Sequence, residues 1–517
     1  MFADDVMVFF DGSLSSLDGI SDTMNLFAAW SGLKMNCEKT QLFVAGLEPG
    51  ESSIFSNSGF AIGSLPIRYL GLPLMSRKLK VSEFSPLLVK MEKKFRSWAG
   101  FSLSYAGRLQ LISSVIYGLV NFWSSVFILP KACIKKMESL CARFLWSGSI
   151  DSHHGAKVAW ADVCYPKNEG GLGLRRLGIW NSTLCLKLIW SLFAGSGSLW
   201  VAWHHHHHIR GKSFWSLPES VHLSWNWKCL LRLRALAEPF VKCDVGNGIK
   251  ASFWFDNWLS LGPLIKFIGD DGPRDLRVPI HANVASACDA HGWNLAAPRT
   301  ANALALHRHL STVRLPLNQP EEDTYSWVIH GKAYHYFSTS KSWEVLRPRE
   351  TIKDWTSSVW FKGATPKHAF TMWVSHLNRL PTRDRLLSWG LQIPQHCCLC
   401  SDYVESRDHL LLTCSFSTLI WQWIQVRLRL SPCIFYTWNA LLVWTKIKTD
   451  SAPPILRKLA AHAAVYHIWK QRNNVLHNGN TRLPSEICKD IDRELKNTIT
   501  ARRSRKLFRD LMLLWIR

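Results

Sequence analysis

The stretch CCLCSDYVESRDHLLLTC, residues 397–414, decides how the C-terminal half of the chain folds. Its metal-binding residue types follow the pattern Cys-x2-Cys-x8-His-x4-Cys, formed by Cys397, Cys400, His409 and Cys414. Three thiolates and one imidazole complete the tetrahedral shell that zinc prefers, and they leave no coordination position open. The spacing therefore predicts a structural zinc site.

The same spacing predicts the local backbone. A gap of two residues lets the sulfurs of Cys397 and Cys400 reach one ion. On a continuous helix, however, His409 and Cys414 would point about 140° apart. One of these two ligands must therefore lie beyond the end of a helix.

A group of buried free cysteines is the alternative interpretation, because such cysteines are common core residues. The polar residues 401–402 and 405–408 instead favour a loop that closes around a metal. Cys398 is the odd thiol, and we expect it not to be a ligand.

The overall charge points to a polyanionic partner. Over 517 residues, 62 Lys and Arg face 38 Asp and Glu, which gives a net charge of +24. Such an excess suits either nucleic acid or an anionic membrane surface. With 47% hydrophobic and 19% charged residues, the chain should fold into several domains. No secretory signal is evident, so reduced or metal-bound thiols are favoured over disulfides.

One segment could be mistaken for a membrane span. Residues 109–129 carry no charge and are long enough to cross a bilayer. They include several polar residues, however, and their apolar positions repeat at helical spacing. We therefore expect a helix of a globular domain and no membrane partner.

The expected fold class is α+β and mostly helical. The opening residues MFADDVMVFF predict a β-hairpin with Asp4 and Asp5 at its tip. Apolar periodicity then predicts a helix that ends at Ser31-Gly32. Further predicted elements are a strand near 41–44, helices near 83–99, 104–127 and 131–146, short mixed pieces over 150–350, and helices around the cysteines and in the tail.

The acidic pair suits metal-dependent chemistry. Nucleotide transfer by two metal ions needs carboxylates that converge on the ions, and a hairpin tip presents them well. Two adjacent Asp residues in an ordinary turn are the alternative interpretation.

Several motifs in order resemble a known family. Phe2-Ala3-Asp4-Asp5 resembles the catalytic box of reverse transcriptases, and residues 32–40 look like the next palm segment. Arg68-Tyr69-Leu70-Gly71 looks like the segment that grips the primer end. Residues 103–108, 144–148 and 166–173 are similar to signatures of plant LINE polymerases. The chain thus resembles, over essentially its whole length, the C-terminal part of a plant LINE (non-LTR) retrotransposon reverse transcriptase.

The resemblance implies an organisation and a chemistry. Asp4 and Asp5 would bind catalytic Mg²⁺, and Lys39 would be a candidate proton donor to the leaving pyrophosphate. The family's fingers and first palm aspartate would precede Met1, so we expect a truncated RNA-directed DNA polymerase that does not extend primers and takes no small molecule beyond deoxynucleotides. The implied parts are a palm remnant with a hairpin (1–62), a thumb-like helical region (63–150), a connector (151–340), a reverse transcriptase zinc-binding domain (341–430) and a basic helical tail (431–517).

The flanks of the cysteine stretch also resemble that zinc-binding domain, which is thought to hold template RNA or target DNA. Cations interleaved with aromatic residues suit nucleic acid. A solvated basic face is the alternative. The residues expected to contact phosphates are Lys362, Lys367, Arg379, Arg383 and Arg385.

Three further features complete the interpretation. The run His204 to His208 predicts a low-complexity loop rather than a soft-metal site. Residues 253–258 predict core with a turn. The sequence of the tail predicts a helix with one apolar face, followed by a basic cluster. It lacks the group of Asp and Glu residues that is typical of a ribonuclease H.

We therefore expect a retrotransposon-derived protein that binds RNA and/or DNA and acts in the nucleus, the location implied by the resemblance. Two alternatives are a zinc-dependent protein-interaction module reused from a retrotransposon, and a pseudogene product without function.

Overall fold

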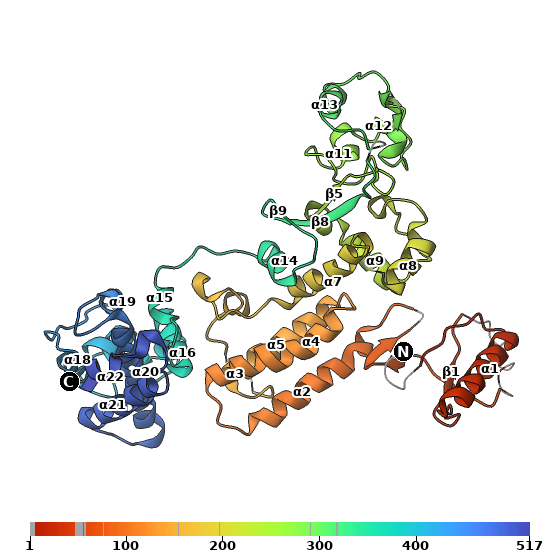
Figure 1. Cartoon of the computed structure of the whole chain (residues 1–517). Helices are drawn as coiled ribbons and strands as arrows, with labels where there is room; N and C mark the ends of the chain where they lie inside the picture. Colours follow the sequence, from red (N-terminus) through yellow and green to blue (C-terminus); the bar gives the residue numbers. More distant parts are fainter. Residues whose placement is uncertain are drawn as a thin grey trace. The chain divides into compact units, whose positions relative to one another are not determined.

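The computed structural model describes residues 6–46, 55, 58–75, 77–152, 155–195, 197–289, 291–316 and 319–516. Helices predominate and the strands are short, as the α+β prediction requires (Figure 1). The chain divides into two compact units, each built from separate segments. Unit 1 comprises residues 1–86, 123–130 and 181–345, and unit 2 comprises residues 87–122, 131–180 and 346–517. The predicted domain boundaries do not coincide with these segments and remain predictions.

Unit 1 contains a three-stranded antiparallel sheet with β8 (Thr324–Ile329) between β5 (Val241–Asp244) and β9 (Lys332–Tyr334) (Figure 1). Trp327 at the centre of β8 is fully buried, and its indole N–H donates to the Ser342 hydroxyl. The remaining strands form two-stranded pairs: β1 (Gln41–Phe43) with β2 (Ala61–Gly63), β3 (Ile67–Tyr69) with β4 (Leu72–Leu74), and β6 (Cys288–Asp289) with β7 (Gly292–Trp293).

Helix α1 (Leu14–Ser31) ends where the sequence predicts. The Ser13 hydroxyl accepts a hydrogen bond from the backbone N–H of Ser16, and Gly32 ends the helix with a φ of 76°. Apart from α7, the other helices of unit 1 are short, and both α7 and α14 extend past its borders. They are α7 (Leu177–Phe193), α8 (Leu199–His204), α9 (Trp225–Arg232), α10 (Arg234–Ala237), α11 (Leu264–Ile268), α12 (Gly272–Asp275), α13 (Ala301–Leu310) and α14 (Thr339–Leu346), with helical turns η2 (Val81–Phe84), η5 (His205–Ile209), η6 (Phe214–Ser216), η7 (Glu238–Phe240) and η8 (Ala285–Ala287).

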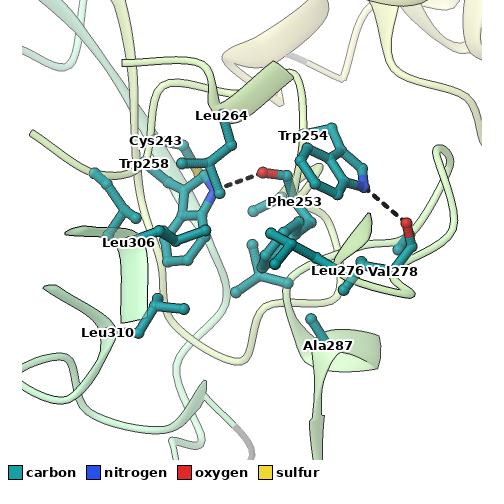
Figure 2. Packing of buried hydrophobic residues seen from close by; sticks show 14 of the residues in the cluster. Cys243, Phe253, Trp254, Trp258, Leu264, Leu276, Val278, Ala287, Leu306 and Leu310 are labelled. Carbon is teal, nitrogen blue, oxygen red and sulfur yellow. Dashed lines mark hydrogen bonds between the residues drawn. The ribbon is translucent and has the colours of Figure 1, made fainter. Parts of the chain in front are cut away.

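The aromatic segment 253–258 forms the centre of a hydrophobic core, as predicted (Figure 2). The indole N–H of Trp254 donates to the carbonyl of Val278 at 3.1 Å, and that of Trp258 donates to the carbonyl of Phe253 at 2.9 Å. Each tryptophan thus buries its ring without leaving its N–H unpaired.

The predicted N-terminal hairpin is wrong in its second strand. Residues 6–10 form no strand, and Phe9 is largely exposed. An extended segment becomes a strand only when a neighbour pairs with its backbone, and no described strand pairs with this one. The first half of the predicted hairpin, with Asp4 and Asp5, lies outside the described residues.

The histidine run is also different from its prediction. His204 ends α8, and His205 to His208 continue as the π-helical turn η5 instead of a loop. The His204 ring is buried and stacks on Trp227 with 4.2 Å between ring centroids. Aromatic stacking therefore holds a segment whose composition suggested an unstructured insertion.

Unit 2 is a helical assembly. The three helices predicted between residues 83 and 146 are present, although the second contains a π-helical turn. Its elements are α2 (Ser85–Ala99), α3 (Tyr105–Leu111), η3 (Ile112–Ile116), α4 (Tyr117–Ser124), α5 (Lys131–Ser147), α6 (Trp160–Val163), η4 (Lys167–Glu169), α15 (Thr356–Val359), α16 (Pro366–His376), α17 (Arg383–Ser388), η10 (His409–Thr413), α18 (Ser415–Arg427), α19 (Trp438–Lys446), α20 (Pro454–Asn478), α21 (Pro484–Thr500), η11 (Lys506–Phe508) and α22 (Leu511–Ile516).

Helix α20 lies at the centre of the C-terminal part of unit 2, where it contacts α16, α18, α19 and α21. Its buried residues occur on every face, which is typical of a helix enclosed by others. Pro454 opens it, and Gly479 closes it with a φ of 62°. The apolar stripe predicted for the tail is the buried face of α21.

Among the residues that the structure describes, no helix combines the length and the apolar character that a membrane span requires. The charge-free segment 109–129 instead begins within α3 and continues through η3 and α4, with Ile112 and Ile116 fully buried.

Candidate metal centre

The first two predicted ligands lie on a tight turn. The N–H of Cys397 donates to the carbonyl of Tyr403 at 2.7 Å, and the N–H of Ser401 donates to the carbonyl of Cys397 at 2.8 Å. Ser401 adopts a left-handed conformation with a φ of 65°. The chain therefore folds back on itself, and the turn brings Cys397 and Cys400 to one side.

The second two ligands lie at opposite ends of a single helical turn. His409 opens the π-helical turn η10, and Cys414 follows that turn in an extended conformation, with φ −59° and ψ 138°. Cys414 also precedes the first residue of α18. Cys414 thus lies beyond the end of the turn that carries His409, as predicted, so the two side chains can point to one ion.

The four ligand atoms converge. All lie within 4.8 Å of one another. The sulfurs of Cys397 and Cys414 are 3.9 Å apart, and the sulfur of Cys400 is 3.3 Å from Nε2 of His409. A tetrahedral zinc ion with bonds of about 2.3 Å to sulfur places two sulfurs about 3.8 Å apart. The spacing and the donor types both fit zinc.

The two buried sulfurs of Cys397 and Cys414 influence each other's protonation. Their hydrogen-bond contact is the chief cause that lowers the pKa of Cys397 and raises the pKa of Cys414. Zinc ligation requires both groups as thiolates, so metal binding at this site would release protons.

Cys398 lies outside the ligand group. Its sulfur is directed to the carbonyl of Arg472, 3.9 Å away, and burial raises its pKa to about 12. A thiol that stays protonated is a poor ligand.

Glu405 is a positioning residue that the sequence did not single out. It lies in the polar insert between Cys400 and His409, but its side chain is fully buried. The Arg472 guanidinium on α20 donates to Glu405 Oε1 at 2.7 Å and 3.0 Å, and to the carbonyl of Pro381. The N–H of Arg383 also donates to Oε1. Glu405 thus joins the metal-binding loop to α20 and to the start of α17.

Comparison with known proteins agrees with this geometry. Residues 337–421 match the family described as zinc-binding in reverse transcriptase. The chain is related to the reverse transcriptases of retrotransposons. The Cys3His cluster lies within the matched residues, and its donor set fits the zinc-binding role by which this family is described.

Two relatives from Arabidopsis thaliana extend the similarity beyond this domain. One, named "Putative ribonuclease H protein", is 27% identical over 364 residues, which cover 68% of the chain and 57% of the relative. The other, an "Uncharacterized mitochondrial protein", is 27% identical over 136 residues, which cover 26% of the chain and 88% of the relative. The chain thus spans a little over half the length of the first.

The predicted phosphate-binding residues fall into two groups around the zinc-binding domain. Lys362 and Arg379 are exposed. The other three already have partners: Lys367 forms an ion pair with Glu494 at 2.6 Å, and the guanidinium groups of Arg383 and Arg385 donate to the carbonyls of His396 and Asn378, respectively. None is fully buried, so all five retain some contact with solvent.

The predicted polymerase residues are not brought together by the described part of the chain. Lys39 is exposed in a turn, where its N–H donates to Asn36. Asp4 and Asp5 lie outside the described residues. The magnesium site and the proton-donor role of Lys39 remain predictions.

Proposed function

We propose that this chain binds single-stranded RNA or DNA through its reverse transcriptase zinc-binding domain, and that it derives from a plant LINE (non-LTR) element. The observation that carries the proposal is a group of side chains next to the zinc loop, which we call the α17 surface: Arg379, Arg385 and Trp389. The Arg385 guanidinium lies 5.1 Å from the centre of the Trp389 ring. Trp389 is 58% exposed, a large apolar ring left open to solvent.

The α17 surface has the chemistry that single strands require. Aromatic rings stack on bases without regard to sequence, and cations beside them contact phosphates. Burial, and then the positive charge of Arg379, lowers the pKa of Arg385. The two cations therefore lie close enough to repel each other, and a phosphate between them would relieve that repulsion.

The zinc loop holds this surface in place. The N–H groups of Arg383 and Asp384 donate to the side chain and carbonyl of Glu405, respectively, at 3.1 Å each. Both residues open α17, so a zinc-closed loop would fix the start of the helix that presents Arg385. A rigid platform loses less entropy when a flexible strand binds.

The test measures binding of fluorescently labelled single-stranded RNA and DNA across a range of salt concentrations. We expect the logarithm of the affinity to fall linearly with that of salt concentration, and Arg379→Gln to reduce the slope by roughly 0.7. Trp389→Ala should weaken binding by about 1–3 kcal/mol at every salt concentration.

Arg493→Gln is the matched control. This exposed arginine lies on α21 of the same unit and pairs with Asp490, so its loss removes one charge away from the α17 surface. Equal effects of Arg379→Gln and Arg493→Gln would show general electrostatic attraction and contradict the proposal. Absence of binding at low salt would favour a protein-interaction module instead.

A further inference from the structure

A second group of metal-binding side chains lies in unit 2, apart from the Cys3His cluster. It consists of His368 on α16, His467 on α20 and Glu494 on α21, with one ligand atom from each within 4.8 Å of the others. Each side chain comes from a different helix, so the packing of α16 and α21 against α20 brings them together. We propose that these three residues bind a second divalent transition-metal ion of the zinc class.

The two oxygens of the Glu494 carboxylate have different neighbours. Its Oε2 lies 2.7 Å from Nε2 of His467 and 3.2 Å from Nε2 of His368. Its other oxygen, Oε1, is 2.6 Å from the ammonium group of Lys367. Carboxylates that bind a metal through one oxygen commonly have the other oxygen held by a hydrogen bond. Lys367 is therefore compatible with a metal at Oε2.

One of the two imidazoles lies near the carboxylate but makes no hydrogen bond through its Nε2 atom. His467 can donate from Nε2 to Glu494, with a length typical of a hydrogen bond. Nε2 of His368 is buried and has no hydrogen-bond partner among the described residues, although it is directed toward the same carboxylate. A buried polar atom without a hydrogen bond destabilises the folded state. A metal ion between the three groups would satisfy it.

The donor types fit such an ion. Two imidazoles and one carboxylate suit zinc, nickel, copper or iron, and three protein ligands leave a position for water.

The experiment counts metal ions in the purified full chain. After loading with zinc and removal of excess metal, elemental analysis should find about two zinc ions per chain, and about one in Glu494→Gln. Cys400→Ser should also retain about one zinc ion, but at the site of His368, His467 and Glu494 instead of the Cys3His cluster. Cobalt loading distinguishes them, because only the Cys3His site gives a thiolate-to-cobalt charge-transfer absorption. That absorption should persist in Glu494→Gln and be lost in Cys400→Ser.

Glu486→Gln on the same helix is the matched control, since Glu486 is partly exposed and lies outside the group. His368→Gln is the second variant, and circular dichroism checks that each variant is folded. One zinc ion in the wild type would overturn the proposal, as would a second ion retained in both Glu494→Gln and His368→Gln. Loss of nucleic-acid binding alone would not contradict this proposal, because the α17 surface contains none of the three proposed ligands.

Discussion

The buried Glu405–Arg472 pair should control the stability of the zinc-binding domain. Both side chains are almost completely excluded from solvent. Replacing Glu405 with Gln removes the negative charge and leaves the guanidinium buried without compensation. We expect Glu405→Gln to lower the free energy of unfolding by about 3–5 kcal/mol, measured by urea titration of the zinc-loaded protein.

Glu350→Gln provides the comparison for that prediction. Glu350 pairs with Lys353 at 3.4 Å in the same unit, and both side chains are well exposed. Exposed pairs contribute roughly 0–1 kcal/mol, so this variant should unfold almost like the wild type. Similar losses in the two variants would show that Glu405 has no special role in holding the loop.

Asp256 in unit 1 should give stability a measurable pH dependence. Its carboxylate accepts hydrogen bonds from Trp215, Tyr325 and the N–H of Ser252, but burial raises its pKa from 3.8 to about 6. The folded state thus binds this proton more tightly than the unfolded state. The protonated Asp256 carboxyl therefore adds to the free energy of unfolding. This added stability is fully present below about pH 4 and is lost as the pH rises through about 6.

Asp256→Asn removes that titration. Between about pH 4 and pH 7, the free energy of unfolding of the wild type should fall relative to the variant by roughly 3 kcal/mol, as the pKa difference requires. Urea unfolding of both proteins across this range measures the difference. Parallel curves for the wild type and the variant would show that the buried carboxyl does not have a raised pKa.

At the scale of elements, the turn between α6 and α7 depends on a glycine without room for a side chain. A Cβ on Gly171 would collide with the backbone carbonyl oxygens of Tyr165 and Asp162, and neither oxygen can move like a side chain. The preceding carbonyl, of Gly170, accepts a 2.7 Å hydrogen bond from the Trp373 indole on α16. We expect Gly171→Ala to destabilise unit 2 by about 1–3 kcal/mol, measured by urea titration.

Gly155→Ala tests whether that loss is specific to the close approach. Gly155 lies in the same unit, with open space where a Cβ would lie and no φ in the left-handed region. Its replacement by alanine should be nearly neutral or slightly stabilising. Equal losses at the two positions would point to backbone flexibility rather than to the collision.

The elements also show what the sequence could and could not predict. Helix α1 and the buried stripe of α21 followed from local periodicity and caps, which depend on residues a few positions apart. The zinc cluster followed from donor types and their spacing. The role of Glu405 was missed because its partner Arg472 is 67 residues away in the sequence. The structure of the histidine run was not predicted because the composition of the run does not show that it stacks on Trp227. The prediction of an N-terminal strand was wrong because a strand forms only when another segment, which can be distant in the sequence, pairs with it.

At the scale of the whole molecule, each unit should unfold as a separate transition, because each buries its own core although the chain passes between them repeatedly. Metal bound to the folded state stabilises only the unit that holds it. A chelator should therefore lower the melting temperature of one calorimetric transition, that of unit 2, and leave the other in place. Asp256→Asn identifies the second transition, since its pH dependence belongs to unit 1. A single transition, or two that shift together on chelation, would show that the crossing segments couple the units into one cooperative fold.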